Sequence, residues 1–263
     1  MKQGIQRRFR VDSLEVAVAG DRVELGRTAA EEATEHLIRL LETQEEVRMV
    51  FAAAPSQTEM LQGLVAHPGI DWSRVTAFHM DEYIGLPREA EQRFGQFLKR
   101  HLFEQVGFRQ VHYLDGGEDP AEACVRYGEL LKEAPIDMVC LGIGENGHIA
   151  FNDPPVADFN DPLPVKIVEL DRECREQQVN DGCFDRLENV PTHAMTLTIP
   201  ALFSGGALFC SVPGPTKRRA VMRTLQGPIE ESCPSTILRR HPQCTLYVDG
   251  DSFDHELWES DHG

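Results

Sequence analysis

Two segments of the chain carry side chains that could move protons. Asp81 and Glu82 are adjacent acids directly after an apolar run, and a carboxylate at the end of a strand can act as a general base. His148 lies in a glycine-rich stretch, five residues before Asp153, and an imidazole changes its charge near neutral pH. We therefore predict that Asp81 and His148 form an acid–base pair.

Each of these segments also has a purely structural interpretation. An Asp or Glu at the end of a strand could cap the following turn or simply be solvated. The sequence at Asn146 and Gly147 could form a tight turn that is followed by a packed histidine. The density of glycines after an apolar run favours the functional interpretation, because glycine lets the backbone approach a ligand.

Two other segments could bind an anion. Ser56 and Gln57 open one predicted helix after an apolar run. Thr216 and Lys217 open another helix in the same way. The first N–H groups of a helix carry positive partial charge, which suits a phosphate, and a lysine adds a full charge. Ser56 as an ordinary helix cap and Lys217 as a solvated side chain remain alternatives.

The overall charge limits the possible partners. The chain has 26 Lys and Arg against 43 Asp and Glu, a formal net charge of −17. This charge repels nucleic acid and anionic membrane surfaces, so we expect neither as a partner. An anionic small-molecule substrate then needs a local cationic pocket. We predict that the helix starts at Ser56 and Thr216 build this phosphate subsite together with Lys217.

Cysteine usage and the amino terminus indicate a compartment. The seven cysteines are scattered and lack CxxC or Cys/His metal spacing, which is typical of reduced thiols in a cytosolic protein. We expect no cofactor and no metal, and therefore activity that survives chelation. The first 20 residues contain charges throughout, and no apolar stretch is long enough to span a membrane. A cytoplasmic enzyme is expected.

These residues must be positioned by alternating strands and helices. Apolar runs of strand length are found at 47–54, 75–79, 136–142, 207–212 and 245–248. A stretch of helical length begins at 28, before the first of these runs. Further stretches of helical length, between the runs, begin at 56 and extend over 91–106, 121–133 and 216–225. Thr28 with Glu31, and Ser56 with Glu59, have the spacing of a capping box.

This alternation is typical of βαβ units, so we predict a layered α/β fold with a mostly parallel sheet flanked by helices, in one domain over residues 1–263. Ligands of such sheets bind beyond the carboxyl ends of the strands, where the four segments above would converge. The stretch 152–164 is rich in Pro and Asp and is predicted to be a surface loop or lid, which could extend to residue 190.

Two motifs resemble those of a known enzyme family. Residues 80–86, MDEYIGL, are similar to the MDEYxGL signature of glucosamine-6-phosphate deaminases, whose relatives include 6-phosphogluconolactonases. Residues 144–154 are similar to the glycine–histidine loop of that family, and weaker similarity extends from residue 28 to residue 237. The resemblance implies a Rossmann-like fold and a cofactor-free isomerisation of an amino-sugar phosphate that releases ammonia.

The resemblance also implies catalytic roles. His148 would help to open the sugar ring, and Asp81 would move a proton between C2 and C1. Asp153 occupies the position of the acid that partners the histidine. Asn146 sits where many members have Asp, and its amide can orient an imidazole.

The substrate-binding residues follow in the same way. The resemblance implies that Ser56, Gln57 and Lys217 lie near the phosphate. The predicted binding set is completed by Glu82, Gly147 and Thr216. Relatives are often homo-oligomers, so a homo-oligomer is possible.

The chain departs from the family pattern where the phosphate would bind. Residues 54–57 read APSQ where the family commonly has GSTP, Asp153 replaces a glutamate, and no arginine can be assigned to the phosphate within residues 180–183. The predicted function is isomerisation and deamination of a glucosamine 6-phosphate-like substrate. A 6-phosphogluconolactonase-type hydrolase and a sugar-phosphate sensor without turnover stay open, although FNDP at 151–154 favours the deaminase.

Overall fold

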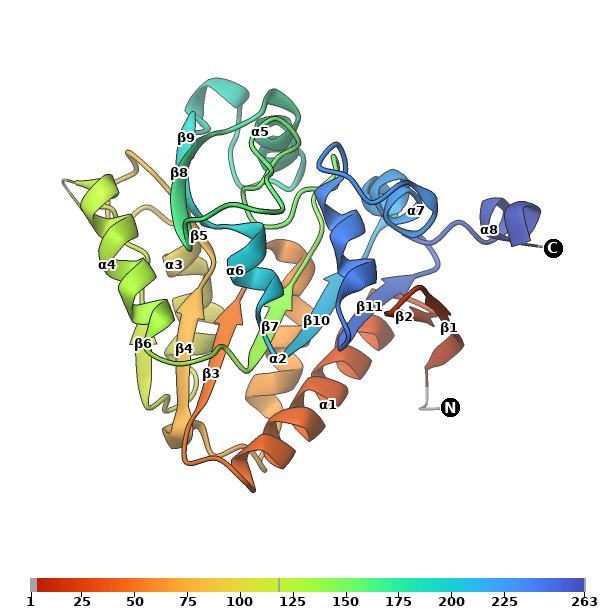
Figure 1. The fold of residues 1–263 in the computed structure, drawn as a ribbon, viewed down its shortest axis with the longest axis horizontal. Coiled ribbons are helices and arrows are strands. Elements are labelled where there is room, and N and C mark those ends of the chain that lie inside the picture. The colour runs from red at the N-terminus through yellow and green to blue at the C-terminus, as the bar shows by residue number, and fades with distance from the viewer. Residues whose placement is uncertain (1–3, 118, 263) are drawn as a thin grey trace.

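The computed structural model describes residues 4–117 and 119–262. Within them, eight strands form one sheet in the order β1-β2-β11-β10-β7-β3-β4-β6 (Figure 1). Neighbouring strands run parallel, except that β1 and β2 are antiparallel. The strands are β1 (Ile5–Val11), β2 (Leu14–Ala19), β3 (Val47–Phe51), β4 (Val75–His79), β6 (Gln110–His112), β7 (Met138–Leu141), β10 (Ala207–Val212) and β11 (Cys244–Asp249).

Helices cover both faces of this sheet and enclose two hydrophobic cores, which confirms the predicted layered α/β fold. In β3, Met49 and Phe51 point into one core and Val50 into the other, because side chains alternate along a strand. The first core lies under α1 (Arg22–Leu41), α2 (Thr58–Ala66) and α3 (Phe94–Leu98). The second lies under α4 (Pro120–Lys132), α6 (Ile199–Phe203) and α7 (Arg218–Gln226).

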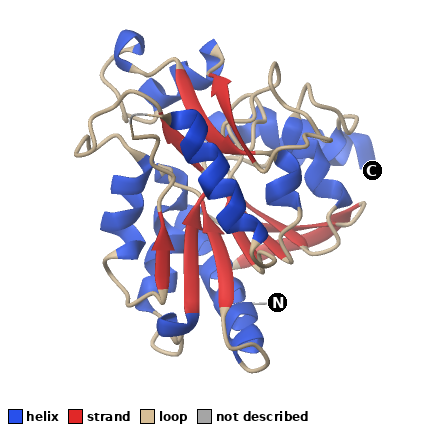
Figure 2. Cartoon of the chain, turned by 60° about the vertical axis from the view of Figure 1, so that its left-hand side comes forward, coloured by secondary structure: helices blue, strands red, loops and turns tan. Residues whose placement is uncertain are grey.

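A smaller antiparallel sheet lies beyond the carboxyl ends of the large sheet's strands (Figure 1 and Figure 2). It consists of β5 (Asp81–Tyr83), β9 (His193–Leu197) and β8 (Val165–Glu169). The helix α5 (Arg172–Asn180) follows β8 along the chain. This small sheet and α5 together form a cap over the edge of the large sheet where ligands of such folds bind. The last helix, α8 (His255–His262), lies away from this edge.

Two helix starts differ from the prediction. α1 begins at Arg22 because the Asp21 side chain caps it by accepting hydrogen bonds from the backbone N–H groups of Val23 and Glu24. Thr28 is fully buried within this helix, so its capping-box spacing is coincidental. Ser56 belongs to a 3-10 turn that precedes α2 and makes no capping bond.

Two other predicted segments also have a different form. The expected helix at 91–106 is the short α3 followed by one π-helical turn, Lys99–Phe103. The predicted lid starts in the interior: Asn152 and Asp153 are fully buried, and the Asn152 amide donates to the carbonyl oxygens of Ile149 and Leu197. The lid itself stays a prediction. Among the described residues, no helix has both the length and the apolar character of a membrane span.

The close contact of α1 with α2 provides a test of this packing. A Cβ atom at Gly26 would lie 2.3 Å from the Cβ of Glu59, so Gly26→Ala should force the helices apart. We expect the free energy of unfolding to fall by about 1–3 kcal/mol, although alanine normally stabilises a helix by roughly 0.5–1 kcal/mol over glycine. Urea unfolding measures the change, with the exposed Glu35→Ala on α1 as control. A Gly26→Ala protein as stable as the wild type would refute the contact.

Candidate active site

A cavity lies at the carboxyl ends of β3, β4, β7 and β10, where the cap meets the large sheet. Its wall contains five residues that the sequence singled out, from four separate segments: Ser56, Gln57, Asp81, His148 and Lys217. The structure thus brings together the predicted acid–base pair and most of the predicted anion-binding residues. Whether they act in these roles stays a prediction.

Asp81 reaches the cavity from β5, immediately after β4. Its side chain is 6% exposed, and β5 is held by antiparallel pairing with β9. Burial raises the pKa of the Asp81 carboxyl well above its usual value, and the neighbouring Glu82 carboxyl raises it further. The carboxyl therefore binds a proton more readily than an exposed aspartate does.

His148 is held by the glycine-rich loop after β7. Its backbone N–H donates to the Asn146 side-chain oxygen, and its carbonyl accepts from the N–H of Gly144. A Cβ atom at Gly144 would lie 2.1 Å from the His148 Cε1 atom, so only glycine leaves room for the ring. Ala150 follows with a left-handed φ of 50°, a conformation that costs free energy and is often found at functional loops.

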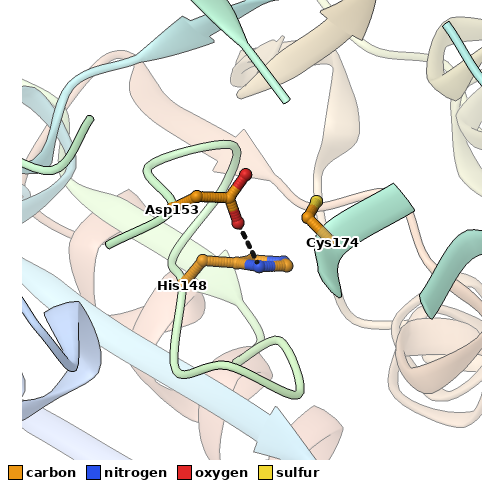
Figure 3. Close-up of side chains that lie close together, drawn as sticks. All are labelled: His148, Asp153 and Cys174. Atoms are coloured by element: carbon orange, nitrogen blue, oxygen red, sulfur yellow. Dashed lines mark ion pairs between the residues drawn. The ribbon is translucent and has the colours of Figure 1, made fainter. Parts of the chain in front are cut away.

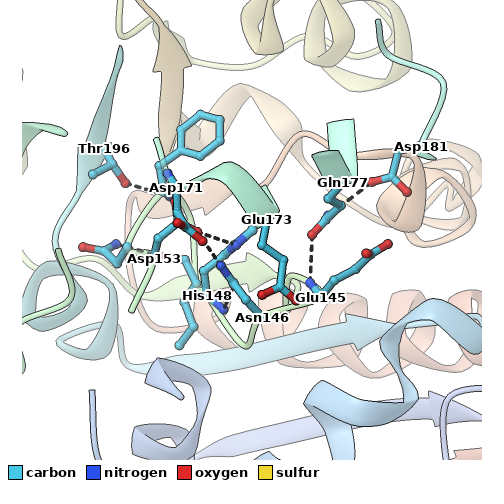
Figure 4. Close-up of polar contacts among 12 residues, drawn as sticks. Glu145, Asn146, His148, Asp153, Asp171, Glu173, Gln177, Asp181 and Thr196 are labelled. Carbon is cyan, nitrogen blue, oxygen red and sulfur yellow. Dashed lines mark hydrogen bonds and ion pairs between the residues drawn. The ribbon is translucent and has the colours of Figure 1, made fainter. Parts of the chain in front are cut away.

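The carboxylate of Asp153 lies against the ring of His148 (Figure 4). His148 Nδ1 is 2.9 Å from Asp153 Oδ1, although the approach is oblique and Nδ1 has no aligned hydrogen-bond partner. Asn146 Nδ2 donates to the same Oδ1 at 3.0 Å, and the backbone N–H of Asp171 donates to Oδ2 at 3.3 Å. Burial alone would raise the pKa of Asp153, but His148 and these hydrogen bonds outweigh it and lower the pKa. Asp153 is therefore a carboxylate beside the imidazole.

The opposite part of the wall holds one cation among neutral groups. Lys217 is 5% exposed; burial lowers its pKa, and Asp181 and Glu145 offset part of the effect. The Gln57 amide donates to the Ser56 hydroxyl at 3.2 Å and to the Ser211 carbonyl at 3.1 Å. Of the described residues that line the cavity, Lys217 is the only lysine or arginine.

Three of the predicted binding residues lie away from this wall. Glu82 points to the other side of β5, where its carboxylate accepts from three backbone N–H groups and pairs with Arg93 at 3.2 Å. Gly147 has φ of 89° and faces Cys233. Thr216 is exposed and borders a separate surface groove.

Other wall residues could not have been singled out from the sequence. Gln177 and Gln178 project from α5, and Cys183 follows that helix. The Gln178 side-chain oxygen accepts from the Tyr83 hydroxyl at 2.8 Å, and the Gln177 oxygen accepts from the Glu145 N–H at 2.8 Å. Glutamines carry no chemical signature in a sequence. Only the burial of an otherwise polar helix would have revealed them.

The raised pKa of Asp81 predicts how stability depends on pH. The native state binds this proton more tightly than the unfolded chain, so the stabilisation is complete below the ordinary pKa of 3.8 and is lost as pH rises through the raised value. Relative to Asp81→Asn, the wild type should therefore lose stability as pH rises above the ordinary pKa of 3.8 and through the raised value. Unfolding free energies of both proteins across this range test the sign.

Asp153→Asn is the matched control. In the wild type, the pKa of Asp153 is lowered in the folded state. The stabilisation by the Asp153 carboxylate is therefore present above the ordinary pKa and disappears as pH falls. The two aspartates should therefore give pH profiles of opposite slope. Equal slopes would contradict the assigned environments.

Comparison with known proteins identifies the family. The model of the glucosamine-6-phosphate isomerases/6-phosphogluconolactonase family matches residues 20–168. Glucosamine-6-phosphate deaminases of Bacillus cereus (strain B4264) and Bacillus anthracis (strain A0248) are 40% identical over 181 residues, which cover 68% of this chain and 67% of each relative.

Solved structures share the fold. A monomeric glucosamine-6-phosphate deaminase superposes with a TM-score of 0.81 at 23% identity, over 90% of this chain and 98% of that chain. The 6-phosphogluconolactonase of Thermotoga maritima superposes with a TM-score of 0.73 at 19% identity, over 89% of this chain and 98% of that chain. Together with the sequence matches, this shows that the chain belongs to the family of glucosamine-6-phosphate isomerases and 6-phosphogluconolactonases.

Proposed function

We propose that this enzyme converts a glucosamine 6-phosphate-like substrate and water into a ketose phosphate and ammonia. The observation that carries the proposal is one cavity that contains a buried carboxyl, Asp81, and an imidazole, His148, with its own carboxylate partner. Relatives at 40% identity are named glucosamine-6-phosphate deaminases, which supports the same chemistry here.

Asp81 would move the carbon-bound proton. As a carboxylate it takes the proton from C2 of the open-chain sugar, and it then returns this proton to C1. On the way, a proton of the substrate's ammonium group passes to O1, so that C1 becomes a CH2OH group and C2 an iminium group. The iminium group adds water and releases ammonia as ammonium, so that atoms and charge balance. A carboxyl whose pKa is raised by burial suits both halves of this transfer, because a general base works best when its pKa approaches the working pH.

His148 would open the sugar ring. Ring opening requires a proton on the ring oxygen, and the imidazolium can donate it. Asp153 would hold the ring in place for this step, since its carboxylate lies 2.9 Å from Nδ1. Asn146 positions both partners by bonding to the His148 backbone and to the Asp153 carboxylate.

Isotope exchange separates the two roles. Asp81→Asn keeps the shape of the side chain but removes the base, so kcat should fall roughly 100- to 10,000-fold and C2 exchange should stop. His148→Gln should slow ring opening and still allow exchange in substrate that has opened spontaneously. Both are followed by NMR at C2 in deuterated water with glucosamine 6-phosphate, alongside ammonia release.

The same experiment decides between the alternatives. C2 exchange at the wild-type rate in Asp81→Asn, or full turnover in His148→Gln, would overturn the assignments. A wild-type protein that binds the sugar phosphate without exchange would be a sensor. Hydrolysis of 6-phosphogluconolactone without ammonia release from amino sugars would instead identify a lactonase.

Lys217 is the group that we propose to bind the phosphate, aided by Ser56 and Gln57. Lys217→Ala should raise KM about 10- to 100-fold, because one charge-assisted contact is lost. Arg218→Ala is the control, since Arg218 is exposed and bonds to the Asp251 carbonyl outside the cavity. Steady-state kinetics on phosphorylated amino sugars give both values. If KM is unchanged in Lys217→Ala, or rises equally in both variants, the phosphate is bound elsewhere.

A further inference from the structure

The thiol of Cys174 lies beside the His148–Asp153 pair and has no part in the proposed reaction (Figure 3). Cys174 is in the first turn of α5 and is 1% exposed. One ligand atom from each of these three residues lies within 4.8 Å of the other two, and all three residues are buried. The group thus joins a nitrogen, an oxygen and a sulfur ligand from two separate segments of the chain.

Two features indicate that this group can hold a cation. His148 is 8% exposed, and its Nδ1 atom faces Asp153 Oδ1 at 2.9 Å without an aligned hydrogen bond. A cation bound between these two atoms would supply the aligned contact that Nδ1 lacks. The Asp153 carboxylate is oriented by the Asn146 amide and the Asp171 backbone N–H. Carboxylates that bind metals are typically oriented by such neighbouring hydrogen bonds.

The ligand types and the local charge select the kind of ion. Imidazole, carboxylate and thiolate together suit Zn²⁺ and ions of similar softness, whereas Mg²⁺ and Ca²⁺ prefer oxygen ligands. The carboxyl groups of Asp153, Asp81 and Asp171 all act electrostatically on the Cys174 thiol. The negative charge of the Asp153 carboxylate beside the thiol attracts a dication.

We propose that His148, Asp153 and Cys174 form a Zn²⁺ site whose occupation inhibits the enzyme. The ion enters through the cavity, which His148 lines, and takes the place of the thiol proton, which is released to solvent. A ring nitrogen that binds a metal cannot also bind a proton, so His148 no longer forms the imidazolium that opens the sugar. The inhibition rests on the proposed function, whereas metal binding itself does not.

Cobalt provides a direct test of binding in the full-length protein. Co²⁺ takes the place of Zn²⁺ in such sites, and its bond to a thiolate gives a charge-transfer absorption in the near ultraviolet. The wild type should show this band on titration, and Zn²⁺ should abolish it by competition. Cys183→Ala should keep the band, because Cys183 lines the same cavity outside the group of three. Cys174→Ala should lose it.

Affinity and inhibition are then measured with Zn²⁺. Competition with a chromophoric chelator should show Zn²⁺ affinity lowered roughly tenfold or more in Cys174→Ala and in the isosteric Cys174→Ser, since loss of a ligand costs at least as much as loss of an outer-shell partner. Cys183→Ala should leave the affinity unchanged. The Zn²⁺ concentration that halves each variant's own rate should shift in parallel. A wild type without the cobalt band, or a Cys174→Ala protein that retains it, overturns the site. Cobalt bound at Cys174 without Zn²⁺ inhibition of ammonia release overturns the inhibition.

Discussion

The fully buried carboxylate of Asp153 is the interaction on which the candidate site depends. A buried charge is costly unless it is paired and hydrogen-bonded. Here Oδ1 accepts a hydrogen bond from the Asn146 amide and lies 2.9 Å from His148 Nδ1. Oδ2 accepts a hydrogen bond from the backbone N–H of Asp171, directly before α5. The neighbouring Asn152 is bonded to the end of β9. Together these contacts fix the glycine-rich loop, α5 and the small sheet relative to one another.

Five strands of the large sheet could be predicted because burial on both faces leaves a strong pattern, whereas β1, β2 and β6 lie outside the predicted runs. β4 and β10 have the bounds expected from the sequence, since every residue in them is buried. The cap could not be predicted in this way. β5 reads DEY, and it is a strand because of its pairing with β9 rather than because of its own composition. β8 reads VKIVE, which is rich in β-branched residues, but it lies outside the predicted apolar runs. The helix α5 is almost entirely polar and has no apolar period to reveal it.

The part of the candidate site that could be predicted consists of residues whose side-chain type alone indicates a chemical role. Asp81, His148 and Lys217 carry an acid, an imidazole and an amine, and each follows an apolar run in the sequence. All three face one cavity. Glu82 illustrates the limit. Adjacent residues of a strand point to opposite faces, so only one of two neighbouring acids can face the cavity. The sequence offers both, and only the recognition of β5 as a strand separates them.

The division of the cavity wall between sheet and cap has a consequence for how such enzymes diversify. Gln177 and Gln178 belong to the cap and Cys183 follows it, and all three lie beyond residue 168, where the match to the family model ends. They contribute to the wall without belonging to the large sheet. Mutations in α5 can therefore change the part of the wall that a bound ligand contacts, while the large sheet, Asp81 and His148 stay in place. Substrate preference can then drift among relatives faster than the reaction they catalyse.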